Sequence, residues 1–331
     1  MESIFDLEMG TSWPLLLCCL ITVLCFIYLW ELTRSYRSNH SIITSGIDIE
    51  GFTSEGIDHS GIDHSGIDHS GIDQRVDDAC YDKFYSKVYD LLVQPIARAP
   101  METKVTLEWM EKNGKAVSDV RIADIGCGTG LHVDLFASQG VKSIVGYDSS
   151  TAMIAEAKSR FPTREFIVGN ATVATMAAAA QFDLVTMFYF TLYLIPERTQ
   201  MLQNIFLWLD MGGVFAVHIV NKNKFDPLLE ACSPFVGFSV QKYADERITK
   251  SQVEFDKFSY TADFNIHGSR ATYEEVFKFK NGSVRRHEHR IWMPDIHAIV
   301  SEIENIGFKL AYHVDLTPIG YEYNYIFFFH K

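Results

Sequence analysis

Residues 123–130 read Ala-Asp-Ile-Gly-Cys-Gly-Thr-Gly and overlap the end of an apolar run at residues 120–125. A short apolar run before such a loop predicts a buried strand of a parallel sheet. Closely spaced glycines let the chain turn sharply and let a ligand approach the backbone without meeting a Cβ atom. Residues 131–138 are predicted to form the next helix, whose N-terminal amides can bind polar ligand atoms. This strand–loop–helix unit predicts an α/β fold with a ligand site at the loop.

The spacing of these glycines argues against a dinucleotide-binding loop. That fingerprint is G-x-G-x-x-G, whereas this loop reads Asp-x-Gly-x-Gly-x-Gly, with Leu131 where the third glycine should fall. Asp124 would also repel a pyrophosphate, because two like charges would face each other. The loop therefore favours a ligand with a positive end and disfavours a nicotinamide oxidoreductase.

The stretch resembles motif I of the class I S-adenosylmethionine-dependent methyltransferases. The resemblance implies S-adenosylmethionine as the cofactor, with its amino end beside Asp124. The loop residues expected to pass beneath the cofactor are Gly126, Cys127, Gly128 and Gly130. The implied fold is a doubly wound, Rossmann-like sheet of seven strands with an antiparallel terminal strand.

The second predicted strand, residues 143–147, is followed by Asp148 and Ser149. In doubly wound sheets, an acid at this position commonly accepts hydrogen bonds from ribose hydroxyls. We therefore predict that Asp148, with Ser149 beside it, binds the cofactor. The alternative is that Asp148 only caps the helix expected at residues 151–160. We consider this weaker, because Asp124 and the glycines indicate a ligand site at the same edge of the sheet.

The third predicted strand, residues 165–168, leads to Asn170 and Ala171. By resemblance, this position contacts the adenine ring, although family members usually carry an acidic residue where this chain has Asn170. An amide oxygen still accepts a hydrogen bond from an exocyclic amine. Both residues are therefore candidates for cofactor binding.

The fourth predicted strand, residues 182–189, is almost continuously apolar, as a strand covered on both faces should be. Residues 187–194 should line the cleft beside the transferable methyl group. Phe188 is a further cofactor-binding candidate, and Tyr189 and Tyr193 are candidates for the substrate side. We identify no catalytic triad, because a sulfonium methyl group is already activated and needs mainly positioning.

Residues 221–293 depart from the strand–helix rhythm. Antiparallel strands are predicted at residues 253–264, 272–280 and 283–292, with a hairpin turn at Asn281-Gly282. By resemblance, this insertion forms a small sheet over the active site. The final residues should add a helix at 295–305 and two strands at 308–316 and 321–330, the last being the reversed strand of the large sheet.

Arg285, His287 and His289 share one face of the last insertion strand, since side chains alternate along a strand. Metal binding, substrate contact and a solvated face are the three interpretations. No third metal ligand is evident from the spacing, so we expect no metal and favour the solvated face.

Helical spacing of aromatic and apolar residues from Tyr81 to residue 92 predicts a helix packed on the domain. By resemblance, Tyr81 and Tyr89 are candidates for covering the cofactor or the substrate.

Residues 13–30 are eighteen residues without a charge, flanked by Trp13 and Trp30. A helix of that length matches the hydrocarbon core of a bilayer. A signal peptide and a buried helix are the alternatives, but residues 1–12 contain no basic residue. Arg34 and Arg37 follow the span, so the positive-inside rule places the catalytic domain in the cytosol.

Residues 31–76 are predicted to be an acidic linker that contains Gly-Ile-Asp-His-Ser repeats. One Ile per five residues cannot build a core, which favours a flexible tether over a loose histidine-rich metal site. Residues 46–78 hold nine acidic residues and one arginine, a large part of the net charge of −13. An acidic chain is a poor binder of nucleic acid, and no disulfide pattern is evident among the six cysteines.

Residues 77–331 are therefore expected to form a membrane-tethered methyltransferase acting on a small molecule with an amine or hydroxyl group. A catalytically silent binding or scaffold module is the alternative from another functional class. A protein or lipid methyltransferase is a further alternative.

Overall fold

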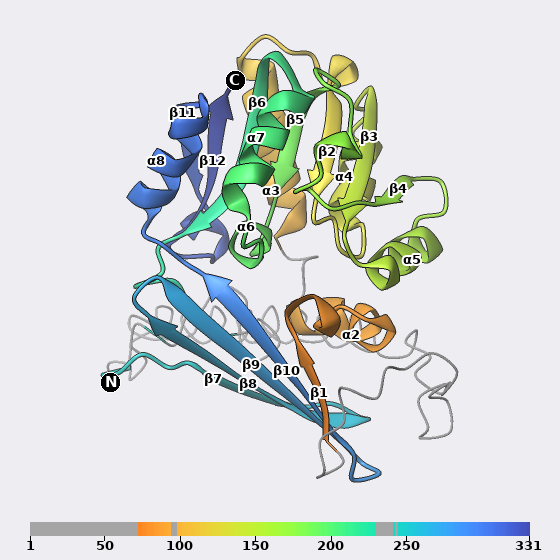
Figure 1. Cartoon of the computed structure of the whole chain (residues 1–331), viewed down its shortest axis with the longest axis vertical. Helices are drawn as coiled ribbons and strands as arrows, with labels where there is room; N and C mark the ends of the chain where they lie inside the picture. The colour runs from red at the N-terminus through yellow and green to blue at the C-terminus, as the bar shows by residue number, and fades with distance from the viewer. Residues whose placement is uncertain (1–71, 94–97, 229–240, 242–243) are drawn as a thin grey trace, which may run out of the picture. The chain divides into compact units, whose positions relative to one another are not determined.

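The computed structural model describes residues 72–93, 98–228, 241 and 244–331 (Figure 1). The predicted N-terminal tail at 1–12, the predicted membrane span at 13–30 and residues 31–71 of the predicted linker lie outside these residues. Within the described part of the chain, no helix has the length and apolar character needed to cross a bilayer.

A seven-stranded sheet forms the framework of the described chain and confirms the predicted Rossmann-like fold. Five parallel strands form its centre and one edge, and two further strands lie at the other edge, in the order β11-β12-β6-β5-β2-β3-β4. The final strand runs antiparallel to both of its neighbours, as predicted. The bounds are β2 Arg121–Ile125, β3 Ser143–Asp148, β4 Glu165–Val168, β5 Phe182–Met187, β6 Leu209–Val220, β11 Lys309–Asp315 and β12 Asn324–His330.

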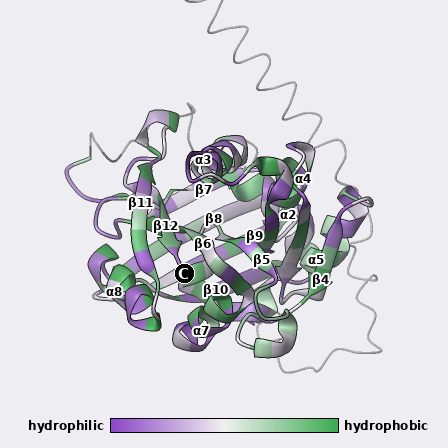
Figure 2. Cartoon of the chain, turned by 90° about the horizontal axis from the view of Figure 1, so that it is seen from above, coloured by the Kyte–Doolittle hydropathy of each residue, from purple (hydrophilic) through white to green (hydrophobic). Residues whose placement is uncertain are grey.

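Helices cover both faces of this sheet (Figure 2). On one face lie α3 (Ala99–Lys112) and α4 (Leu131–Ser138), and on the other lie α7 (Arg198–Trp208) and α8 (Ile296–Ile306). Neighbouring strand residues therefore enter different cores. Ile122 packs with the α3 side and Ala123 with the α7 side, because successive side chains point to opposite faces. Helix α5 (Thr151–Arg160) packs beside β3 and β4.

A second, five-stranded sheet, which we call the roof sheet, contains the predicted insertion strands in the order β1-β10-β9-β8-β7. Its strands are β1 Ile72–Val76, β7 Lys250–Glu254, β8 Phe258–His267, β9 Arg270–Phe279 and β10 Val284–Trp292. The single strand predicted at residues 253–264 is wrong: the chain turns between β7 and β8, and Phe255 N–H bonds to Phe258 O at 2.9 Å.

Strand β1 corrects the predicted linker boundary at residue 76. Ile72 and Asp73 belong to the fourth, incomplete copy of the pentapeptide repeat, yet they pair in parallel with Val284 and Arg285 of β10. A carboxylate oxygen of Asp73 also lies 3.4 Å from the Arg285 guanidinium. The pairing partner is distant in sequence, so repeat composition alone does not reveal the strand.

Helix α2 (Lys83–Val93) confirms the predicted N-terminal helix and connects the two sheets (Figure 1). Phe84 packs edge-to-face against Phe277 with ring centroids 5.1 Å apart. Lys87 forms an ion pair of 2.5 Å with Glu156 of α5. The helix thus touches the roof sheet on one side and the large sheet's helical layer on the other.

Candidate active site

The glycine loop after β2 forms the floor of a pocket at the carboxyl ends of the parallel strands. Gly126 has φ +70°, and a Cβ atom there would lie 2.4 Å from the Thr191 side chain, so no other residue fits without rearrangement. Gly128 has φ +54° and faces Tyr89 of α2, whose ring would lie 3.8 Å from an added Cβ atom. The loop therefore brings bare backbone to the pocket surface, as predicted.

Six of the predicted site residues line this pocket together. They are Asp124, Gly126, Cys127, Gly128, Phe188 and Tyr189. Its wall also contains Tyr89, Arg98, Thr129, Leu131, His132 and Thr191. Tyr89, a seventh predicted residue, was proposed from the family resemblance, whereas Arg98 and His132 were not identified from the sequence.

Asp124 lies at the end of β2 and is only 2% exposed. Its Oδ1 accepts a hydrogen bond of 2.7 Å from Thr186 Oγ1. Burial raises the pKa of the Asp124 carboxyl to about 6, which nearby His132 partly offsets. A buried carboxylate with so few donors favours a cationic ligand beside it.

Arg98 and His132 form the wall of the pocket through a shared, fully buried partner, Glu102. His132 Nε2 lies 2.7 Å from Glu102 Oε2, and Arg98 Nε lies 3.5 Å from Glu102 Oε1. Burial alone would raise the pKa of Glu102, but the His132 hydrogen bond and the Arg98 charge lower it to about 2. The ionised Glu102 thereby holds the Arg98 guanidinium and the His132 ring at the pocket that Asp124 also lines.

Tyr189 follows β5 with φ +54°, a left-handed conformation that costs a non-glycine residue about 1–3 kcal/mol. The Arg98 guanidinium carbon lies 3.9 Å from the centre of the Tyr189 ring. Such strain at a pocket surface is typical of functional positions. Tyr189 therefore stays a candidate for the substrate side.

Asp148 ends β3 and does not line the pocket in the described residues. Its Oδ2 accepts from the Gly128 N–H at 2.9 Å, and its Oδ1 accepts from the Ser150 N–H at 2.8 Å. A carboxylate has about four acceptor positions, so ribose hydroxyls can still bind. Ser149, between these residues, is exposed.

Asn170 is exposed and uses its side-chain oxygen locally. Its Oδ1 accepts from the Thr172 N–H at 2.9 Å and from Thr172 Oγ1 at 2.8 Å. Ala171 is buried, and its carbonyl accepts from Asn204 Nδ2 at 2.8 Å. Adenine binding by these two residues stays a prediction.

Tyr193 does not reach the pocket, which corrects its assignment as a substrate-side candidate. It is 1% exposed in the core beneath α7, and its hydroxyl accepts a hydrogen bond of 2.8 Å from the Val220 N–H. Its position in α6 (Thr191–Leu194) turns the ring toward β6. Tyr193 therefore supports the end of a strand.

Gly130, a predicted cofactor-binding residue, also lies outside the pocket wall and faces the Phe166 ring.

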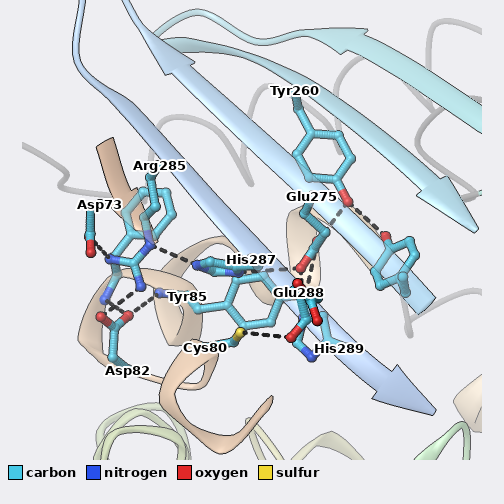
Figure 3. Close-up of polar contacts among 12 residues, drawn as sticks. Asp73, Cys80, Asp82, Tyr85, Tyr260, Glu275, Arg285, His287, Glu288 and His289 are labelled. Carbon is cyan, nitrogen blue, oxygen red and sulfur yellow. Dashed lines mark hydrogen bonds and ion pairs between the residues drawn. The ribbon is translucent and has the colours of Figure 1, made fainter. Parts of the chain in front are cut away.

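A second polar cluster lies in the roof sheet around Glu275, which is fully buried (Figure 3). Glu275 Oε1 lies 3.0 Å from the Tyr85 hydroxyl and 2.6 Å from the Tyr260 hydroxyl. Glu275 Oε2 lies 3.3 Å from His287 Nδ1 and 2.9 Å from His289 Nε2. Burial alone would raise the pKa of Glu275, but the hydrogen bonds from both histidines hold it below its usual value.

The cluster corrects the preferred interpretation of the β10 face. Arg285, His287 and His289 do share one face, as predicted, but that face is buried against α2 instead of solvated. The structure also brings Cys80 of the 3-10 turn Asp77–Cys80 close to the histidines, with one donor atom from each residue within 4.8 Å of the others. Cys80 was not identified as a third potential ligand because it lies far away in sequence.

The pocket fits the amino-acid end of S-adenosylmethionine. Asp124 and Arg98 line one pocket with opposite charges, which matches an ammonium and a carboxylate on one carbon atom. The bare backbone of Gly128 leaves room beside them.

Comparison with known proteins supports this fit. Residues 122–213 match the family model described as a methyltransferase domain. The trans-aconitate 2-methyltransferase of Variovorax paradoxus is 32% identical over 108 residues, which are 32% of this chain and 40% of the relative. The ubiquinone/menaquinone biosynthesis C-methyltransferase UbiE of Campylobacter jejuni is 25% identical over 169 residues, 49% of this chain and 69% of the relative.

Solved structures agree on the fold. An S-adenosylmethionine-dependent methyltransferase from Clostridium acetobutylicum superposes with a TM-score of 0.58 at 17% identity, covering 76% of this chain and 98% of that one. The CcbJ methyltransferase from Streptomyces caelestis gives 0.57 at 16% identity, covering 75% and 96%. The chain thus resembles S-adenosylmethionine-dependent methyltransferases in sequence over residues 122–213 and in fold over 76% of its length, which supports S-adenosylmethionine as its cofactor.

Proposed function

We propose that the protein transfers a methyl group from S-adenosylmethionine to a small molecule that bears an amine or a hydroxyl group. The main support is the presence of Asp124 and Arg98 in the wall of one glycine-floored pocket, which suits the cofactor's charged end. The bound cofactor would supply a methyl group already activated on a sulfonium. The relatives named for trans-aconitate and for quinone biosynthesis support a small-molecule acceptor.

The residues of the chain would bind the cofactor, orient it toward the acceptor and exclude water from the site. Asp124 would hold the ammonium, and Arg98 would hold the carboxylate of the cofactor. Asp148 would accept hydrogen bonds from the ribose, with Asn170 and Ala171 beside the adenine. Tyr89 and Tyr189 lie at the pocket wall where the acceptor would approach.

We also propose that residues 13–30 anchor the domain to a membrane with the catalytic part in the cytosol. The uncharged run and the two arginines that follow it support this orientation. Asn281-Gly-Ser is a glycosylation acceptor pattern on an exposed turn. Glycan on Asn281 in eukaryotic cells would contradict the cytosolic orientation.

The direct test uses full-length protein, methyl-labelled S-adenosylmethionine and a metabolite extract, and asks which compound gains label. Label in a small molecule supports the proposal, whereas label only in protein or lipid supports the alternative substrates. Cofactor binding without any labelled product would favour a silent scaffold module. Calorimetry on Asp148→Ala tests the cofactor site, because unchanged affinity would remove Asp148 from it.

A further inference from the structure

One histidine lies in the wall of the cofactor pocket, among the groups that would hold the amino-acid end of the ligand. His132 is the second residue of α4, directly after the glycine loop, and it lines the pocket together with Asp124 and Arg98. Its side chain is 12% exposed, and its ring packs on the Phe188 ring with centroids 4.7 Å apart. The ring therefore reaches the pocket surface, where a ligand can touch it.

Glu102 determines which nitrogen of His132 carries a proton. His132 Nε2 lies 2.7 Å from Glu102 Oε2. Although burial raises the pKa of Glu102, the His132 hydrogen bond and the Arg98 charge lower it to about 2, so Glu102 is ionised. An ionised carboxylate only accepts hydrogen bonds, so the nitrogen that faces it must be the N–H. In the neutral ring, Nδ1 is then a bare lone pair that can accept a hydrogen bond.

This acceptor is available to a ligand. Within residues 72–93, 98–228, 241 and 244–331, the His132 side chain bonds to Glu102 through Nε2, and its Nδ1 has no hydrogen-bond partner. The Nδ1 atoms of His218 and His289 also have no partner there, but they are buried. Nδ1 of His132 differs from them because it belongs to a side chain that is partly exposed in the pocket.

Asp124 needs a companion acceptor if it binds an ammonium group. An ammonium has three N–H donors, and Asp124 Oδ1 already accepts from Thr186 Oγ1 at 2.7 Å. His132 lies close enough to Asp124 to offset part of the rise that burial causes in the pKa of that carboxyl. Arg98 can only donate hydrogen bonds, so it suits the ligand's carboxylate. His132 Nδ1 can therefore share the ammonium with Asp124.

We propose that His132 binds the cofactor directly: its Nδ1 accepts a hydrogen bond from the ammonium group, whose charge Asp124 balances. Glu102 is a positioning residue that acts through His132 by holding the Nε2 proton. The pocket then distinguishes ligands by their amino end, because a ligand without the ammonium leaves both acceptors without a donor. This inference rests on the proposed binding of S-adenosylmethionine.

The opposite assignment is that His132 donates from Nδ1 to the ligand's carboxylate. It needs a doubly protonated ring between that carboxylate and Glu102. Arg98 already offers the planar pair of donors that a carboxylate prefers, so the carboxylate needs no second cation. The two assignments differ in the proton on Nδ1, which can be measured.

The test pairs a change in the ligand with a change in the residue. The ligands are S-adenosylhomocysteine and its deaminated analogue, which keeps the carboxylate and carries hydrogen in place of the ammonium. Each is titrated calorimetrically into full-length protein at pH 8, where Asp124, with its pKa raised to about 6 by burial, is ionised. His132→Gln keeps an amide that can donate to Glu102 but offers no acceptor at the position of Nδ1.

We expect His132→Gln to bind S-adenosylhomocysteine about tenfold more weakly, because one hydrogen bond to a charged group is lost. Its affinity for the deaminated analogue should stay at the wild-type level. The wild-type preference for the ligand with the ammonium should therefore shrink about tenfold. A general disturbance of the pocket would weaken both ligands and leave the preference unchanged.

His218→Gln is the matched control. His218 Nδ1 lies 3.9 Å from Glu102 Oε1, but the residue is 1% exposed and does not line the pocket. This variant should keep the wild-type preference between the two ligands. If it lost the preference as His132→Gln does, the effect would belong to Glu102, and the role of His132 Nδ1 would be overturned.

Nitrogen-15 spectra of the histidine-labelled wild type locate the proton without any substitution. In the complex with S-adenosylhomocysteine, His132 should carry its proton on Nε2 alone. A proton on Nδ1, or equal losses for both ligands in His132→Gln, would overturn the role of His132 and leave cofactor binding standing. A wild type that binds neither S-adenosylmethionine nor S-adenosylhomocysteine would overturn the proposed function as well.

Discussion

Asp124 and Glu275 are both almost completely buried, yet they are prepared for opposite tasks. Asp124 receives one hydrogen bond from Thr186, and burial raises its pKa to about 6. Glu275 lies within hydrogen-bond distance of four donors, and the two histidines outweigh burial and lower its pKa. The number of donors, more than depth, decides whether a buried carboxylate is stable in its charged form. Asp124 therefore keeps acceptor positions for a ligand, whereas the donors of the fold already surround the Glu275 carboxylate.

The largest effect on stability should come from removing the Glu275 carboxylate, which four donors of the fold surround. Glu275→Leu removes the carboxylate that four buried donors share, and we expect the free energy of unfolding to fall by about 3–5 kcal/mol. Urea denaturation measures this loss. Glu274→Leu is the matched control, because Glu274 is exposed on the same strand and should change stability by less than about 0.5 kcal/mol. Similar losses in the two variants would contradict the central role of Glu275.

Removing the charge of Asp124, which has only one hydrogen-bond donor, should stabilise the ligand-free protein. Asp124→Asn keeps an acceptor for Thr186 but abolishes a charge that burial disfavours, so the free energy of unfolding at pH 7 should rise by about 1–3 kcal/mol. The same variant should bind S-adenosylmethionine about 10–100-fold more weakly, since a charged hydrogen bond is lost.

Calorimetry and denaturation on one sample measure both effects of Asp124→Asn. Asp134→Asn serves as control, because Asp134 lies on α4 outside the pocket and pairs with Arg164. If Asp124→Asn were less stable than the wild type and kept full cofactor affinity, Asp124 would be a structural carboxylate and not a ligand-binding one.

The pH dependence of cofactor affinity tests the same contrast without a mutation. The pKa of Asp124 is raised to about 6, so its carboxylate is ionised at pH 7.5 and mostly protonated at pH 5. Affinity should fall about tenfold over this interval, in proportion to the ionised fraction. The Asp124→Asn protein should show a flat profile there, and an equal slope in both proteins would assign the titration to another group.

The two regions also differ in how much of them could be predicted from sequence. The strands, the glycine loop and Asp124 are local features, because alternation, apolar runs and spacing lie within a few residues of one another. The Glu275 cluster unites β9, β10 and α2, so its burial depends on contacts between distant segments. Arg98 was missed for the same reason: it enters the pocket from the start of α3, where no motif marks it.

Tyr193 shows why neighbouring residues of one predicted segment can separate in the structure. Tyr189 and Tyr193 were predicted together, but α6 turns Tyr193 into the core, where it bonds to the Val220 N–H. Tyr193→Phe removes that hydrogen bond and should lower the free energy of unfolding by about 0.5–1.5 kcal/mol without changing cofactor affinity or turnover. Thermal unfolding and calorimetry measure the two quantities. Tyr189→Phe is the natural comparison, since its ring stays beside Arg98 at the pocket. If the Tyr193 variant lost turnover while keeping its stability, its hydroxyl would belong to the reaction after all.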